Sequence, residues 1–95
     1  MKRLEDKKAV ITGATGGIGE ATARRLLAEG ATVMLAARSG ETLSNLAGTL
    51  DSDRIHICPT DISSDTDCKS LAERSVSEMG GIDILFCNAG FEGSI

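Results

Sequence analysis

Short apolar segments rich in β-branched residues alternate along this chain with segments whose apolar residues recur at helical spacing. Strands that are joined through helices run parallel, with right-handed crossovers, so the alternation predicts an α/β fold. Four strands and three helices fit a doubly wound parallel sheet in the order 3-2-1-4. The expected strands are residues 8–12, 32–36, 54–58 and 82–87, and the expected helices begin at 17, near 43 and after 63.

Each expected helix carries aligned residues on one face, and the first and third also have a start or stop signal. Gly30 and the pair 80–81 stand where helices end, and residues 63–65, Ser-Ser-Asp, supply N-cap candidates for the third helix. The aligned residues are Ile18, Thr22 and Leu26 in the first helix, Leu43, Leu46, Ala47 and Leu50 in the second, and Ala72, Val76 and Met79 in the third. No linker or repeat interrupts the pattern, so residues 1–95 are expected to form one domain, truncated at its C-terminal end.

Composition limits the partners of this chain. The net charge of −4 and the 2% of aromatic residues argue against nucleic acid, because phosphate binding needs a basic face and single strands need aromatic platforms. No apolar run reaches the roughly 20 residues of a membrane span, and four of residues 1–6 are charged, unlike a secretory signal. We therefore expect a soluble, cytoplasmic protein with neither nucleic acid nor membrane as a partner.

The thiols and the single imidazole do not predict a metal site. Cys58, Cys68 and Cys87 are widely spaced and form no C-x-x-C pair, which is typical of reduced thiols in a cytoplasmic protein. His56 has no second histidine with which to complete a ligand set, and we expect it to be an ordinary strand residue.

A glycine-rich turn lies between the first expected strand and the first expected helix. Residues 12–19 read Thr-Gly-Ala-Thr-Gly-Gly-Ile-Gly. Glycines there let the backbone approach a phosphate, and a helix N-terminus favours an anion. Gly19 is followed by Glu20 rather than by Lys-Ser/Thr, which excludes a P-loop and a nucleoside triphosphate. The turn predicts a pyrophosphate site, and the alternative is a tight turn without a ligand.

The spacing of this turn resembles the T-G-x-x-x-G-I-G loop of the short-chain dehydrogenase/reductase family, which binds NAD or NADP on a Rossmann-type fold. The matching residues are Thr12, Gly13, Gly17, Ile18 and Gly19. The same stretch also fits T-G-x-x-G-x-x-G, the pattern of the superfamily's extended branch, through Gly16. The loop alone leaves both branches open.

Two later segments favour the short branch. Residues 61–62, Asp-Ile, follow the third strand, where family members place an aspartate on the adenine amino group and a backbone amide on the ring. Residues 88–90, Asn-Ala-Gly, follow the fourth strand and match the family's N-A-G motif beside the cofactor's ribose, with Cys87 replacing the asparagine that many members have just before it. The resemblance extends from Lys7 to Gly90 and implies these cofactor-binding residues: Gly13, Thr15, Gly16, Gly17, Ile18, Gly19, Arg38, Ser39, Asp61, Ile62, Asn88, Ala89 and Gly90.

The end of the second strand favours NADP over NAD. In dinucleotide folds the residue about 20 positions past the glycine turn faces the adenosine ribose. An acidic side chain there would repel a 2′-phosphate, but this chain has Ala37 and then Arg38, whose planar cation suits a phosphate. Thr15 stands where many NADP-binding relatives carry a second basic residue.

Catalytic residues are not predicted in this chain. The resemblance implies hydride transfer between nicotinamide and a carbonyl or alcohol carbon, with a Tyr-x-x-x-Lys pair and a serine. The chain has no tyrosine, and its last lysine is Lys69. The substrate and the oligomeric state are not encoded in these residues.

Three interpretations remain open. The first is the cofactor-binding part of an NAD(P)-dependent oxidoreductase, which would meet a small carbonyl or alcohol substrate only together with further chain. The second is a stand-alone dinucleotide-binding or sensor module. The third is an interaction fragment whose fourth strand pairs with another chain, since Leu85 and Phe86 would be poorly covered at that edge.

Overall fold

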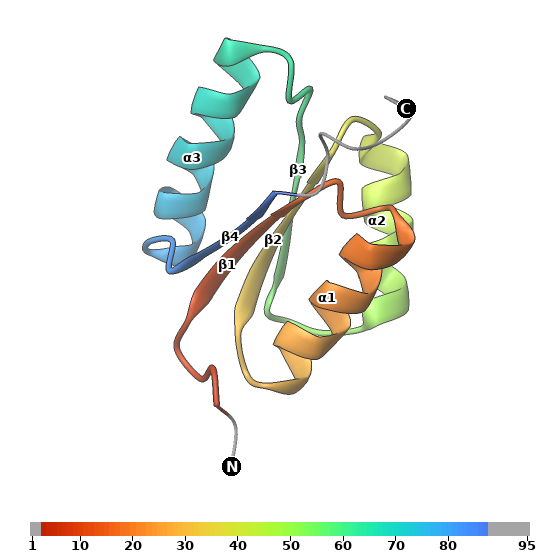
Figure 1. Cartoon of the computed structure of the whole chain (residues 1–95), viewed down its shortest axis with the longest axis vertical. Helices are drawn as coiled ribbons and strands as arrows, with labels where there is room; N and C mark the ends of the chain where they lie inside the picture. Colours follow the sequence, from red (N-terminus) through yellow and green to blue (C-terminus); the bar gives the residue numbers. More distant parts are fainter. Residues whose placement is uncertain (1–2, 88–95) are drawn as a thin grey trace.

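The computed structural model describes residues 3–87, which form a four-stranded parallel sheet and three helices (Figure 1). The strand order is β3-β2-β1-β4, which confirms the order 3-2-1-4 expected from the sequence. The elements in chain order are β1 Lys8–Thr12, α1 Gly17–Ala28, β2 Thr32–Ala37, α2 Gly40–Leu50, β3 Ile55–Pro59, α3 Asp65–Met79 and β4 Ile84–Cys87.

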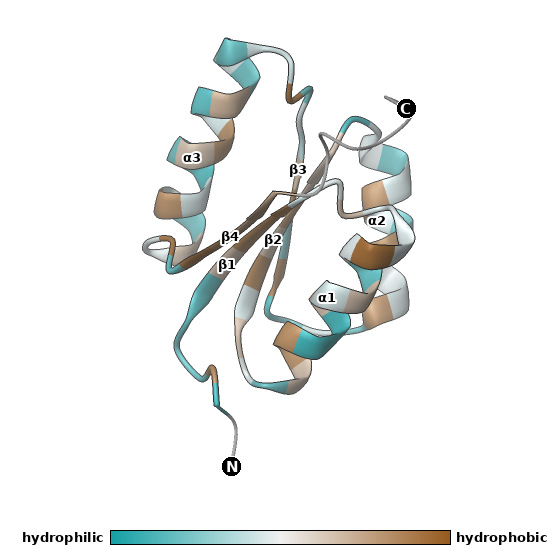
Figure 2. Ribbon diagram, in the orientation of Figure 1, coloured by the Kyte–Doolittle hydropathy of each residue, from teal (hydrophilic) through white to brown (hydrophobic). Residues whose placement is uncertain are grey.

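Helices cover both faces of the sheet. Figure 1 shows α1 and α2 on one side and α3 on the other. Alternate residues of the central strands serve the two sides: Ala9 and Ile11 of β1 pack toward Leu27 of α1 and Leu43 of α2, whereas Val10 lies in the cluster under α3. This two-sided burial explains why the strands read as unbroken apolar runs, and Figure 2 shows the apolar colouring gathered along the sheet.

The buried row of α3 differs from the row expected from the sequence. Leu71, Ser75 and Met79 are buried, whereas Val76 is 55% exposed and Ala72 is also exposed. Because Ser75 is polar, the buried row does not show as an apolar pattern at helical spacing. Its burial is tolerated because the Ser75 hydroxyl donates to the Leu71 carbonyl oxygen at 2.7 Å.

The buried row of α1 likewise includes small residues. Gly19, Ala23 and Leu27 face the sheet, while Ile18 is 65% exposed and Leu26 is half-buried. Small residues at 19 and 23 let the helix approach the sheet closely, and they contribute little to a hydrophobic pattern. The aligned residues Ile18, Thr22 and Leu26 therefore mark the flank of the buried face.

The last strand begins two residues later than expected. Gly80 and Gly81 have φ values of 91° and 158°, and Asp83 then pairs with Lys8 in both directions. The Asp83 N–H donates to the Lys8 carbonyl oxygen at 2.7 Å, and the Lys8 N–H donates to Asp83 Oδ2 at 2.8 Å. In β4, Leu85 is 61% exposed, as expected for this edge of the sheet. Phe86 was expected to be poorly covered as well, but it is half-buried and packs against the core cluster that contains Ile11.

Candidate functional site

The glycine-rich turn connects β1 directly to the N-terminus of α1. Gly13 has a φ of 65°, a left-handed conformation that glycine adopts without steric cost. The Gly16 N–H donates to the Gly13 carbonyl oxygen at 3.2 Å, which closes the turn. Gly16 is the N-cap and has no side chain with which to cap the helix. The N–H groups of the first helical turn lack intrahelical acceptors and point out of the helix end, where an anion is favoured.

Two glycines of this turn have different surroundings. A Cβ added at Gly19 would lie 2.5 Å from the Gly13 carbonyl oxygen and 2.8 Å from Ala14 Cα. Both obstructing atoms belong to the backbone, so Gly19 is required for the helix to pack on the turn. A Cβ added at Gly17 would meet nothing within 4 Å. The outer side of the turn is therefore open at Gly17, where a bound group could approach the backbone.

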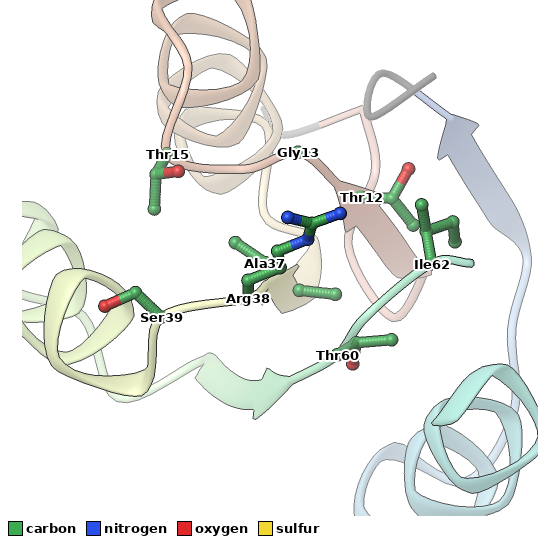
Figure 3. Close-up of a pocket in the computed structure, with 9 residues that line it drawn as sticks. Thr12, Gly13, Thr15, Ala37, Arg38, Ser39, Thr60 and Ile62 are labelled. Carbon is green, nitrogen blue, oxygen red and sulfur yellow. The ribbon is translucent and has the colours of Figure 1, made fainter. Parts of the chain in front are cut away.

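A cleft of about 280 Å³ lies at the C-terminal ends of β1, β2 and β3 (Figure 3). In doubly wound folds ligands bind outside the C-terminal ends of the strands. Backbone hydrogen bonds hold the walls together: the Ala14 N–H donates to the Ala36 carbonyl oxygen at 3.2 Å, and the Thr60 N–H donates to the Ala37 carbonyl oxygen at 2.7 Å. The lining residues are Thr12, Gly13, Thr15, Ala36, Ala37, Arg38, Ser39, Thr60 and Ile62.

Arg38 provides the positive charge of the cleft lining. Its side chain is 79% exposed, and its Nε lies 3.8 Å from Asp61 Oδ1. Figure 3 shows the guanidinium lying over the middle of the cleft, between Gly13 and Ile62. None of the four residues at the end of β2, which are 36–39, is acidic.

Asp61 is held in place by hydrogen bonds from its own loop. Its Oδ1 accepts from the Ser63 N–H at 3.0 Å and from the Ser63 hydroxyl at 2.6 Å. These two bonds are the main cause of a lowered pKa of the Asp61 carboxyl, and the nearby Arg38 charge adds to them. The carboxylate is therefore ionised at neutral pH.

Asp67 fixes the backbone of the same loop, although the sequence analysis did not single it out. Its Oδ2 accepts from the Asp61 N–H at 2.9 Å, and its own N–H donates to Ser64 Oγ, the N-cap of α3, at 3.2 Å. The S-x-x-D spacing of residues 64–67 was the available signal, because an acidic N3 residue commonly reaches back to an N–H group ahead of its helix.

Ser39 has a structural role at the rim of the cleft. It is the N-cap of α2, and its Oγ accepts from the Thr42 N–H at 3.1 Å and from the Thr42 hydroxyl at 2.9 Å. Figure 3 shows its hydroxyl pointing away from Arg38. A hydroxyl has two acceptor positions and one donor, so the Ser39 O–H remains the group with which it could donate to a ligand.

The cleft also contains residues that sequence analysis did not name as site residues. Thr60 is 4% exposed, and its hydroxyl donates to the Cys58 carbonyl oxygen at 2.9 Å. Thr12 lines the cleft, and its hydroxyl donates to the Phe86 carbonyl oxygen at 3.4 Å. The position of Thr60 just after a parallel strand was its only signal, whereas Thr12 is the first residue of the T-G-x-x-x-G-I-G pattern.

The structure brings several of the predicted residues together. Gly13, Thr15, Arg38, Ser39 and Ile62 line one cleft, and Asp61 joins them through Arg38. The other predicted residues of the turn, 16–19, form the start of α1. Residues 88–90, the expected ribose-contacting motif, lie outside the described residues.

The remaining candidate groups show no metal site within residues 3–87. In that range no group of three or more His, Cys, Asp or Glu side chains is placed to hold a metal ion. His56 Nδ1 lies 3.2 Å from Glu78 Oε1, and Cys58, Cys68 and Cys87 are all free thiols. Among the helices in the described part of the chain, none has the length and apolar character needed to cross a membrane.

The fold and the turn define an α/β protein of the dinucleotide-binding type, and sequence comparison gives the family. The profile of the short chain dehydrogenase family matches residues 7–95, and the chain belongs to that family. An uncharacterized oxidoreductase of Staphylococcus aureus (strain USA300) is 43% identical over 90 residues, which cover 95% of this chain and 39% of that protein. The chain therefore spans about two-fifths of the length of this relative.

Solved structures show the same arrangement of strands and helices. The 3-ketoacyl-(acyl-carrier-protein) reductase from Brucella melitensis, complexed with NADH, matches with a TM-score of 0.82 and 36% identity over 87% of this chain and 34% of its own. The apo form of glucose dehydrogenase from Caenorhabditis elegans matches with a TM-score of 0.87 and 29% identity over 96% of this chain and 40% of its own. These likenesses confirm the Rossmann-type fold.

Proposed function

We propose that residues 1–95 form the NADP(H)-binding unit of an oxidoreductase that transfers hydride between the nicotinamide and a carbonyl or alcohol carbon. The family favours this interpretation over a separate sensor module or an interaction fragment. The cofactor, when bound, supplies the hydride chemistry, and the residues described above bind and orient it. No catalytic residue is assigned, because the chain has no tyrosine.

The glycine-rich turn is suited to the pyrophosphate. The first turn of α1 presents N–H groups to an anion, and the open space beside Gly17 lets a phosphate approach them. Two observations support this assignment: Gly19, which must be close-packed, lies against the backbone of the turn, and Gly17 has open space beside its Cα.

The position and charge of Arg38 are the observation that supports a preference for NADP over NAD. Its guanidinium lies over the cleft and is 79% exposed. We assign it to the 2′-phosphate. A charge-assisted phosphate contact contributes roughly 1.5–3 kcal/mol, or about a tenfold to hundredfold gain in affinity.

Replacement of Arg38 tests this assignment. We expect Arg38→Asp to weaken NADPH binding about tenfold to hundredfold and to shift selectivity toward NADH, because a carboxylate repels the 2′-phosphate. The measurement is calorimetric titration of the 95-residue chain with each cofactor, after circular dichroism has shown that the chain is folded.

Arg25→Asp is the matched control. Arg25 is 76% exposed and stands in the last turn of α1, at the opposite end of that helix from the cleft. This variant should leave the ratio of the two dissociation constants unchanged. A folded wild-type chain that binds neither cofactor would overturn the binding site, and an unchanged ratio in Arg38→Asp would overturn the role of Arg38 alone.

A further inference from the structure

A carboxylate lies within ion-pair range of the Arg38 guanidinium. Arg38 Nε lies 3.8 Å from Asp61 Oδ1, and the Asp61 side chain is 45% exposed. Among the described residues, Asp61 is the acidic residue within ion-pair range of Arg38. The cation assigned to the 2′-phosphate therefore already has a counter-ion.

The loop keeps this counter-ion in position. The two hydrogen bonds from Ser63 hold the Asp61 carboxylate, and the Asp67 carboxylate holds the Asp61 N–H. An incoming phosphate therefore meets a fixed negative charge beside Arg38, whereas a free surface carboxylate would rotate away at little cost.

We propose that Asp61 is a specificity-determining residue that limits the preference for NADP(H) by acting as the counter-ion of Arg38. The proposal rests on the proposed function of the cleft. A 2′-phosphate must compete with Asp61 for the guanidinium. NADH carries a ribose hydroxyl at that position, so it does not compete with Asp61 for the guanidinium. Asp61 therefore affects the two cofactors unequally, which a purely structural residue would not do.

The test is the substitution Asp61→Asn, read as the ratio of the dissociation constants for NADH and NADPH. Asparagine retains an acceptor oxygen for the Ser63 N–H and hydroxyl, so the loop should keep its shape. Removal of the charge should raise the ratio about three- to tenfold in favour of NADPH, as expected for one partly exposed charge contact with a doubly charged phosphate. Any contact of Asp61 with the adenine would change both constants together and cancel in the ratio.

Asp65→Asn is the matched control. It removes the same charge from an exposed residue in the first turn of α3, four positions along the chain from Asp61. It should leave the ratio unchanged. If it raises the ratio as much as Asp61→Asn does, the effect comes from net charge, and the proposal is wrong. Asp61→Ala provides a second variant with the same expected direction.

An Arg38→Ala background shows whether Asp61 acts through Arg38. There, Asp61→Asn should change the ratio less than about twofold, because the coupled partner is absent. An undiminished rise would mean that Asp61 repels the phosphate directly, and it would overturn the counter-ion role. Wild-type protein that prefers NADPH while Asp61→Asn leaves the ratio unchanged would overturn this inference alone. Wild-type protein that binds neither cofactor would overturn the proposed function itself.

Discussion

Gly17 and Gly19 are two residues apart in one turn, yet the structure constrains them for different reasons. Gly19 is enclosed by the backbone of the turn, whereas Gly17 has open space around its missing side chain. The first therefore bears on the stability of the fold and the second on access to the helix N-terminus. A sequence motif gives both positions equal weight, and only the contacts separate them.

Gly19→Ala should lower the free energy of unfolding by about 1–3 kcal/mol or more, because a methyl group at 2.5 Å from a carbonyl oxygen forces the helix away from the turn. Chemical denaturation monitored by circular dichroism measures the change. Gly48→Ala is the control: Gly48 lies within α2 with nothing near its missing Cβ, so alanine there should stabilise by about 0.5–1 kcal/mol. Equal effects at 19 and 48 would contradict the steric argument.

The sequence identified most single residues of the cleft but not those whose roles depend on the tertiary structure. The glycine turn and Arg38 could be found because each has a spacing or a charge that is rare at that place. Thr60 could not, because a threonine after a strand is common and only the parallel pairing puts it against the cleft. Asp67 was missed because its role depends on the Asp61 N–H, which the folded loop brings to its carboxylate.

The order of strands and helices was predictable, whereas the buried faces of two helices were not. Strands buried on both sides give long apolar runs, and β1 and β2 could therefore be predicted from the sequence. In α1 and α3 the buried rows contain Gly19, Ala23 and Ser75, which hydropathy does not recognise as core residues. Their neighbours Ile18 and Val76 are more apolar and yet mostly exposed. At these positions, close packing of the helix on the sheet requires a small residue rather than a large apolar one.

The hydrogen bonds at the start of α3 hold both the helix and the adjoining loop of the cleft. Ser64→Ala removes the Ser64 Oγ that accepts from the Asp67 N–H, and loss of such a cap should lower the free energy of unfolding by about 0.5–2 kcal/mol. Thermal denaturation measures this loss. Ser77→Ala, at an exposed position within the same helix, is the control and should be neutral or slightly stabilising. A neutral Ser64→Ala would show that the cap does not hold this helix.

At the scale of the whole molecule, a polar cluster of Arg74, Glu78 and His56 joins α3 to the edge strand β3. Arg74 Nε donates to Glu78 Oε2 at 2.9 Å, and Arg74 Nη2 donates to the Ile57 carbonyl oxygen at 3.1 Å. His56 of β3 meets the other oxygen of the same carboxylate. The hydrogen bond from Arg74 is the main cause of the lowered pKa of Glu78, and burial partly opposes it.

Stability should therefore fall in acid. A carboxyl whose pKa is lower in the folded state contributes stability above its unfolded pKa, near the ordinary value of 4.5, and loses it as the pH falls through the folded pKa. Glu78→Gln should lower the free energy of unfolding at pH 7 by less than about 1 kcal/mol, since the pair is partly exposed. The difference from wild type should shrink toward pH 3. Urea titrations at several pH values measure it, with Glu73→Gln as the control.

Backbone groups make two of the contacts that join the walls of the cleft. The bonds from the Ala14 N–H to the Ala36 carbonyl oxygen and from the Thr60 N–H to the Ala37 carbonyl oxygen involve no side chain. The width of the cleft is thus a property of the sheet, whichever side chains project into it. A combinatorial library at positions 37, 38 and 62 should consequently change which nucleotide is recognised while the frame stays the same, which makes this part of the molecule a suitable starting point for redesigning cofactor use.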